Sequence, residues 1–227
     1  MNYNWLRSDA VARWRFDGDR YDDSENNYHL IYGGDPAGYK LGRFGQSIYF
    51  SGATGQTCAY YVAAYSDELK YLTFSLVAWI KATATGERTI ISFNEYFDYS
   101  GAWGWALCTF DGVVRFSSAN GDGSSNWSVT DGTKPVNDGA WHQIVLVRTP
   151  STTKIFVDGL LDISDSSDDL DYPTTVSIAI AVGTNVCLDY GYYGDRFIGL
   201  IDDVIILSSA LSAQSIYQMY AFQMGWI

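Results

Sequence analysis

The sequence has few cysteines and few positive charges. Its 227 residues include only 3 cysteines, Cys58, Cys108 and Cys187, and their wide spacing matches neither a disulfide framework nor a C-x-x-C metal site. We therefore expect Cys108 to be an ordinary core residue. Lysine and arginine number 14 against 26 acidic residues, which gives a net charge of −12. Because binding to a phosphate backbone needs clustered Lys and Arg, the sequence predicts no nucleic-acid partner.

Long apolar runs are also missing. No stretch approaches the roughly 20 apolar residues that span a bilayer. The N-terminus MNYNWLRSDAVARW lacks the basic start and apolar core of a signal peptide. We expect no membrane insertion and no signal peptide, and the sequence leaves open whether the protein stays in the cytoplasm after synthesis or joins a virion.

The chain consists instead of short β-prone runs, in a composition that is 47% hydrophobic and 16% aromatic. A chain of this length is expected to form one packed domain, residues 1–227. Asp-Gly turn signals at 111–112 and 158–159 separate some of the runs, the latter as a two-residue hairpin. This pattern predicts an all-β sandwich or jelly roll. The predicted strands are 11–16, 47–50, 73–82, 89–93, 104–110, 113–118, 141–148, 154–157, 175–182 and 197–207.

The two ends of the chain depart from the β pattern. Residues 1–9 form an arm before the first predicted strand, and residues 212–221 have apolar side chains at helical spacing behind Ser212, a predicted N-cap. After this short helix comes the apolar tail FQMGWI. Trp226 and Ile227 need a surface, on the domain itself or on a neighbour, because they would otherwise expose apolar side chains to water.

The run 141–148, WHQIVLVR, has apolar residues on both faces in mid-strand. Such a strand is expected in the centre of a sheet that is covered on both sides. His142 at its start is interpreted as a structural histidine that is hydrogen-bonded in place, and His29 is interpreted in the same way.

Several short motifs follow one another in a characteristic order. They are ARWRFDGD, DDSENNYH, GRFGQSIYFSG, FSLVAWIKA, NDGAWHQIVLVR, KIFVDG and GLIDDVIILSSALSAQSI, and they span residues 10 to about 218. In this order they resemble the LamG-like jelly rolls of the concanavalin A-like lectin/glucanase superfamily. The resemblance implies two antiparallel sheets packed face to face, with the first strand beside the last. Segments 94–103 and 183–196 look longer and more aromatic than the usual connections of that family.

The superfamily includes glycoside hydrolases, whose retaining members place two carboxyl groups about 5–5.5 Å apart. This chain has four glutamates, at positions 25, 68, 87 and 95, and no E-x-D-x-x-E strand. The aspartate-rich run 162–171, DISDSSDDLD, is typical of a solvated turn. Motifs of serine hydrolases, zinc proteases and P-loop proteins are absent as well. The sequence therefore predicts a protein that is not an enzyme.

Asp202 and Asp203 interrupt the apolar strand 197–207. In an alternating strand they point to opposite faces, so one of them needs a partner where an apolar residue is expected. The resemblance implies a structural Ca²⁺ ion at this place, which would take oxygen ligands from both ends of the chain. The candidate metal ligands are Asp17, Asp19 and Asp202. The alternative is an aspartate that caps backbone N–H groups or pairs with Arg13 or Arg15.

A binding surface is predicted where two connections meet. Segments 94–103 and 118–126 are separated by the hairpin at 111–112, so they emerge at the same end of the sheet. Aromatic faces beside Asn and Asp side chains are suited to a saccharide, although each ring could instead pack on the domain as a local core. The candidate ligand-binding residues are Tyr96, Tyr99, Trp103, Asn120, Asp122, Asn126, Trp127, Tyr192 and Tyr193.

Two classes of function follow. The first is a non-catalytic binding module for a neutral saccharide, a surface glycan or a cell surface, since a charge of −12 disfavours polyanionic glycans. The second is a structural protein, such as a phage virion decoration or tail-associated subunit, with virion or homo-oligomer contacts through the chain termini. The fold resemblance and the aromatic loops favour the first class, and the apolar ends favour the second.

Overall fold

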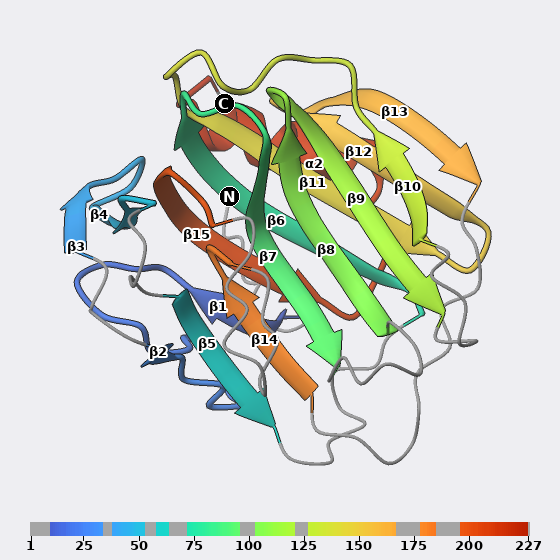
Figure 1. Ribbon diagram of the computed structural model, residues 1–227. Helices are drawn as coiled ribbons and strands as arrows, with labels where there is room; N and C mark the ends of the chain where they lie inside the picture. Colours follow the sequence, from blue (N-terminus) through green and yellow to red (C-terminus); the bar gives the residue numbers. More distant parts are fainter. Residues whose placement is uncertain are drawn as a thin grey trace.

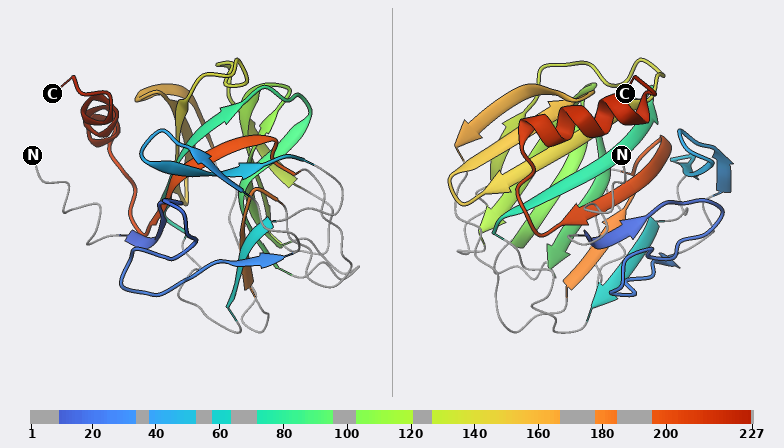
Figure 2. Two further views of the ribbon diagram at one scale, coloured as in Figure 1. Left: turned by 90° about the vertical axis from the view of Figure 1, so that its left-hand side faces the viewer. Right: turned by 180° about the vertical axis from the view of Figure 1, so that it is seen from behind.

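Two antiparallel sheets and one helix make up the computed structural model, which describes residues 10–33, 38–52, 58–63, 72–95, 103–120, 127–166, 178–184 and 196–226. The sheets lie face to face (Figure 1), and the helix α2 (Ala213–Gln223) lies across the outward face of one of them (Figure 2). The predicted all-β jelly-roll sandwich with a short C-terminal helix is confirmed. None of the helices in these ranges has the length and hydrophobicity needed to cross a membrane.

Sheet A contains both the first and the last strand of the described chain. Its strands are β1 (Ala10–Trp14), β3 (Gly38–Leu41), β4 (Gln46–Phe50), β6 (Phe74–Ala82), β11 (His142–Thr149), β12 (Thr152–Val157), β13 (Leu160–Ser166) and β15 (Gly199–Leu207). Their order is β13-β12-β11-β6-β15-β4-β3, and β1 pairs with β15 beside this path. The antiparallel pairing of β1 with β15 confirms the expected contact between the two ends of the chain.

Sheet B faces sheet A across the core. Its strands are β2 (Ile31–Gly33), β5 (Cys58–Ala63), β7 (Glu87–Glu95), β8 (Trp103–Phe110), β9 (Val113–Asn120), β10 (Trp127–Asp131) and β14 (Ile178–Val182). Their order is β10-β9-β8-β7-β14-β5-β2. Two-residue turns join β8 to β9 and β12 to β13, and Asp111 and Asp158 adopt the positive φ values, 48° and 53°, that such hairpin turns require.

Every predicted run contains a strand, but the sequence missed β2, β3, β5, β10 and β13. The last of these corrects the interpretation of residues 162–171 as a turn, because residues 162–166 belong to β13. This strand lies at the edge of sheet A, and its residues are exposed or half-buried. Charged residues are common on an edge strand, where they discourage pairing with other chains, so an aspartate-rich composition does not exclude a strand.

The main core lies between the two sheets. Trp105 is at its centre and stacks on Phe74 and Phe93, with ring centroids 5.3 and 5.5 Å apart. Cys108 is fully buried, as predicted. The strand β11 lies between β6 and β12 and is buried along almost its whole length, which confirms its predicted central position.

A second, smaller core lies between sheet A and α2. Ile216 and Met219 of the helix pack there with outward-facing residues of the sheet such as Val77, Val145 and Ile205. The helix begins after Ser212, whose side chain accepts a hydrogen bond from the Ser215 N–H at 3.0 Å. The predicted helix and its N-cap are therefore confirmed.

Candidate functional site

Asp202 and Asp203 lie at a β-bulge near the middle of β15. Asp202 is opposite Trp79 of β6, and the register then shifts before Ile205. Asp203 has a φ of 45°, in the left-handed region that aspartate tolerates better than most residues. The expectation that the two side chains point to opposite faces is therefore wrong. Asp202 binds the backbone of Phe44, and Asp203 lines the same groove as the Phe44 ring.

The fully buried Asp202 holds the turn between β3 and β4. Its Oδ2 accepts hydrogen bonds from the backbone N–H groups of Arg43 (2.7 Å) and Phe44 (3.0 Å). Its Oδ1 has no hydrogen-bond partner in the described part of the chain. Burial raises the pKa of Asp202 from 3.8 to about 7, and the charge of Asp203 adds to this effect, while the two N–H groups oppose it. Asp202 thus caps backbone N–H groups, one of the alternatives that the sequence left open.

A second carboxylate, Asp17, holds the other end of the same turn. Its Oδ1 accepts a hydrogen bond from the Gln46 N–H at 2.9 Å, and its Oδ2 accepts one from the Arg15 guanidinium at 3.1 Å. Glycine is required in the turn for this double contact. A Cβ atom on Gly42 would lie 2.6 Å from the Asp202 Oδ2, and one on Gly45 would collide with the Asp17 Oδ1.

Asp203 is paired with an arginine. The Nε and Nη2 atoms of Arg13 donate to its Oδ1 at 3.1 and 2.9 Å. The sequence left open that Asp202 pairs with Arg13. Because of the bulge, it is Asp203 that forms this pair.

The predicted calcium ligands do not form one cluster. Asp17 and Asp202 contact opposite ends of the 42–46 turn, and the exposed Asp19 accepts a hydrogen bond from the Tyr21 N–H at 3.1 Å. Within the described ranges, no three acidic, His or Cys side chains are placed to hold a metal ion. Because calcium takes 6–8 oxygen ligands, these three carboxylates as arranged do not fit a calcium site. Calcium binding stays a prediction, for which chelation is the test.

Both histidines have the structural contacts that were expected. His29 accepts a hydrogen bond at Nδ1 from the Asp22 N–H at 3.0 Å. His142 lies between Asp158, at 2.8 Å from its Nδ1, and Asp138, at 3.1 Å from its Nε2. The hydrogen bond with Asp158, assisted by Asp138, raises the pKa of His142 above 6.5 against the effect of burial.

The aromatic end predicted as a ligand site belongs to sheet B. Trp103 begins β8 opposite Asn120 of β9, and Ala119 lies opposite Trp127, which begins β10. The backbone thus brings three of the predicted ligand positions to the same end of three neighbouring strands. The other predicted ligand residues, Tyr96, Tyr99, Asp122, Asn126, Tyr192 and Tyr193, lie outside the described residues.

Sequence reasoning missed an aromatic cluster on the outward face of sheet A. Trp79 stacks on Tyr220 of α2 with ring centroids 5.9 Å apart, and it meets Phe44 edge-on at 5.7 Å. The Arg43 guanidinium lies 4.9 Å from the Trp79 ring centroid and donates to the backbone oxygen of Gln223 at 3.1 Å. No sequence signal indicated that α2 and the 42–46 turn cover Trp79.

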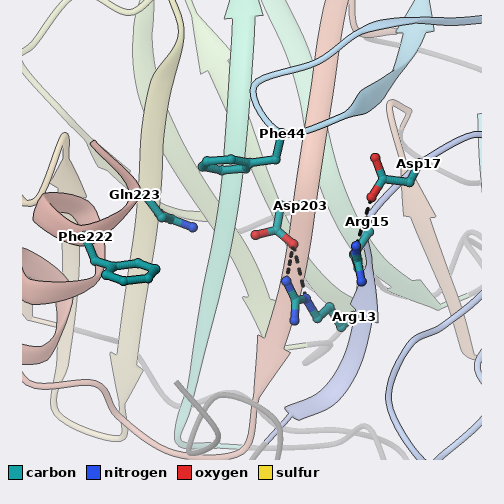
Figure 3. Close-up of a pocket in the computed structure, with 7 residues that line it drawn as sticks. All are labelled: Arg13, Arg15, Asp17, Phe44, Asp203, Phe222 and Gln223. Carbon is teal, nitrogen blue, oxygen red and sulfur yellow. Dashed lines mark hydrogen bonds and ion pairs between the residues drawn. The ribbon is translucent and has the colours of Figure 1, made fainter. Parts of the chain in front are cut away.

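A groove of about 410 Å³ lies beside this cluster, between β1, β15, the 42–46 turn and the end of α2. Figure 3 shows Asp203 and Arg13 in the middle of the groove, with Phe44 reaching in from the turn and Phe222 from the helix. The lining residues are Arg13, Arg15, Asp17, Phe44, Asp203, Phe222 and Gln223. The sequence did not predict this groove, because its walls come from four separate segments of the chain.

Comparison with protein families gives one match. The model described as the concanavalin A-like lectin/glucanases superfamily matches residues 55–217. Among curated proteins, none matches the chain in sequence.

Solved structures with the same fold include domains of larger proteins. Domain 4 of AbnA, an extracellular arabinanase from Geobacillus stearothermophilus solved with arabinotriose, is 21% identical with a TM-score of 0.69, and the match covers 93% of this chain and 98% of that domain. The binding domain of Paraclostridial Mosquitocidal Protein 1 is 15% identical with a TM-score of 0.70, and a botulinum neurotoxin type C structure is 16% identical with a TM-score of 0.72. These matches cover 96% and 98% of this chain, respectively, and 53% of each toxin chain. The chain thus spans about half of each toxin chain.

Proposed function

The chain belongs to the concanavalin A-like lectin/glucanases superfamily, and from this membership we propose that it is a non-catalytic module that binds a neutral saccharide or surface glycan. The similar solved structures include binding domains of toxins. Another similar structure was solved in complex with arabinotriose, and a third is of a toxin whose cell entry depends on ganglioside molecules. These names support a saccharide as the class of ligand.

The proposed ligand site is the aromatic end of sheet B. The observation that carries it is the backbone register, which pairs Trp103 with Asn120 and, one residue further along β9, Ala119 with Trp127. In this register Trp103 and Asn120 share one face of the sheet, and Trp127, opposite Ala119, is on the other face at the same end. The directly opposed positions 103 and 120 thus combine an aromatic residue, for apolar contact, with an amide residue, for hydrogen bonding. A sugar ring needs both kinds of contact.

The absence of catalysis is part of the proposal. The chain has only four glutamates. The one at 87 lies near Arg115, with 3.9 Å between the charged atoms, and the one at 95 ends β7. Glycoside hydrolysis usually needs a pair of carboxyl groups across the scissile bond, whereas these two glutamates stand at opposite ends of the nine-residue β7. Cleavage of a β-glucan at a rate that an Asp or Glu substitution abolishes would contradict this part.

A glycan array with neutral and anionic oligosaccharides tests the proposed site. We expect neutral saccharides to bind, and Trp103→Ala or Trp127→Ala to weaken binding by roughly 1 kcal/mol with little change in melting temperature. Tyr217→Ala is the matched control, because it removes an exposed ring from α2 on the other sheet. Tight binding of heparin at physiological salt, or unchanged binding in both tryptophan variants, would contradict the proposal.

Assembly into a larger particle is a second candidate function, favoured by the surface of the C-terminal segment. Residues 204–227 contain no charged side chain, although the chain carries a net charge of −12. The exposed apolar residues there are Tyr217, Phe222, Met224 and Trp226. Light scattering of the purified chain distinguishes the two functions. Assembly predicts a concentration-dependent oligomer that Trp226→Ala weakens, and a monomer at every concentration would leave this candidate without support.

A further inference from the structure

We propose that the groove in Figure 3 is a second binding site, which takes a neutral, hydroxyl-rich ligand such as a short oligosaccharide. It lies on sheet A and uses none of the residues at the aromatic end of sheet B. Its volume of about 410 Å³ lies within the range of small-molecule sites. The proposal goes beyond the proposed function, because either site can bind a ligand when the other does not.

The charges of the groove are paired with one another. Arg13 donates twice to Asp203, and Arg15 donates to Asp17, so two guanidinium groups face two carboxylates. An anionic ligand would be repelled by both carboxylates and by the net charge of −12, and a cation would be repelled by both guanidinium groups. A neutral ligand avoids both kinds of repulsion and can still use the charged groups as strong hydrogen-bonding partners.

Polar atoms of both kinds face the groove. The Oε1 atom of Gln223 accepts hydrogen bonds from the Trp79 Nε1 at 3.1 Å and the Gln143 Nε2 at 2.7 Å. Its amide nitrogen is therefore turned away from the sheet, and Figure 3 shows it pointing toward Asp203. Arg15 adds N–H donors and Asp17 adds an acceptor, with side chains 48% and 36% exposed. Hydroxyl groups, which donate and accept, match such a mixture.

Two phenyl rings supply the apolar part of the site. Phe44 and Phe222 reach the groove from different elements (Figure 3), and 43% of Phe222 is exposed. Asp202 fixes the backbone of Phe44. Gln223, the residue after Phe222, is anchored to the sheet by its hydrogen bonds with Trp79 and Gln143. The groove is thus largely preformed, which lowers the entropy that a ligand must overcome on binding.

Nuclear magnetic resonance of the full chain provides a test that reports on each site separately. Arabinotriose, cellotriose and maltotriose are titrated to millimolar concentration, and the side-chain N–H signals of Gln223, Trp103 and Trp127 are followed. We expect at least one sugar to shift the Gln223 amide signal in a saturable way. If only the indole signals move, the groove proposal is wrong and the proposed function stands; if only Gln223 moves, the groove is supported and the sheet B site is wrong.

Variants with exposed side chains keep the fold and sharpen the result. Phe222→Ala and Arg15→Gln are each expected to weaken binding at the Gln223 signal by roughly fivefold to tenfold. Tyr217→Ala, on the same helix and outside the groove, is expected to leave it unchanged. Equal affinity in wild type and both groove variants, or equal weakening in the Tyr217 control, would overturn the proposal.

Discussion

Trp79 on sheet A and the two tryptophans at the aromatic end of sheet B lie beside different elements, and this contrast separates a structural ring from candidate ligand platforms. On sheet A, Trp79 is 1% exposed, is stacked on Tyr220 and donates its indole N–H to Gln223. On sheet B, Trp103 and Trp127 begin β8 and β10, the two strands that flank β9. The residue type alone does not decide the role of an aromatic side chain; the element that covers it does.

Truncation of the buried indole is the strongest way to test this contrast. Trp79→Ala leaves a cavity under α2 and removes a hydrogen bond, so we expect a loss of about 3–5 kcal/mol in the free energy of unfolding. Trp127→Ala should cost less than about 1 kcal/mol if its ring is a platform for ligand. Chemical denaturation measures both. Equal losses would show that the aromatic end of sheet B is another local core.

The pH dependence of stability is the next largest expected effect. The pKa of Asp202 rises from 3.8 to about 7 on folding, so the folded protein binds more protons than the unfolded chain between these values. Stability is therefore highest below about pH 4 as far as this group is concerned, and falls as the pH rises toward 7. Thermal melts in EDTA at several pH values test this, and Asp202→Asn should flatten the profile.

Calcium would change this result in a defined direction. A bound cation favours the charged carboxylate, so added calcium should raise the melting temperature near pH 7, and Asp202→Ala should abolish that gain. Identical melting curves with calcium and with EDTA would make the calcium prediction wrong.

The hydrogen bonds of Asp202 account for a smaller effect. At pH 5, Asp202→Ala leaves the buried N–H groups of Arg43 and Phe44 without their acceptor, which should cost about 1–3 kcal/mol. Asp202→Asn keeps a carbonyl oxygen in place and should cost less. If urea unfolding gives the same loss for both variants, the contact with the turn is not what Asp202 contributes.

The smallest expected effect concerns His142. Its pKa is raised by Asp158 and Asp138, so its contribution is complete below about pH 6.5 and is lost as the pH rises through the higher folded value. His142→Gln should remove this part of the pH dependence and cost about 1 kcal/mol or less at pH 6. A profile above pH 6.5 that is the same in wild type and variant would contradict the assignment.

The sequence predicted the central strands and two hairpins of the molecule, but it did not predict the β-bulge or the edge strand β13. Alternating apolar residues and the Asp-Gly pairs at 111–112 and 158–159 located most strands and two hairpins, because these signals are local. The bulge at Asp203 escaped prediction, since nothing in GLIDDVIIL shows which residue leaves the alternation. The strand β13 was missed because edge strands are polar, and a polar run also fits a turn.

The candidate site was predicted only where it depends on strand order. The hairpin at 111–112 is enough to bring Trp103 opposite Asn120, whereas Trp127 reaches the same end through β10, which the sequence did not predict. The groove on sheet A depends on where α2 crosses the sheet. Hydrophobic periodicity predicts the helix itself but not its position on the sheet. Phe44 and Phe222 are far apart in sequence, and only the packed helix makes them neighbours of one groove.

The pairing of the first strand with the last also determines how the domain would respond to mechanical force. Ala10 lies opposite Leu207, and Trp14 lies opposite Val204, so a force that separates residues 10 and 207 loads the hydrogen-bonded pairs one after another, as in an opening zipper. β15 would remain in place, because it also pairs with β6 and β4. Under tension between these points β1 is expected to peel off first, at low force, and single-molecule stretching should reveal it as an early step before the sandwich itself unfolds.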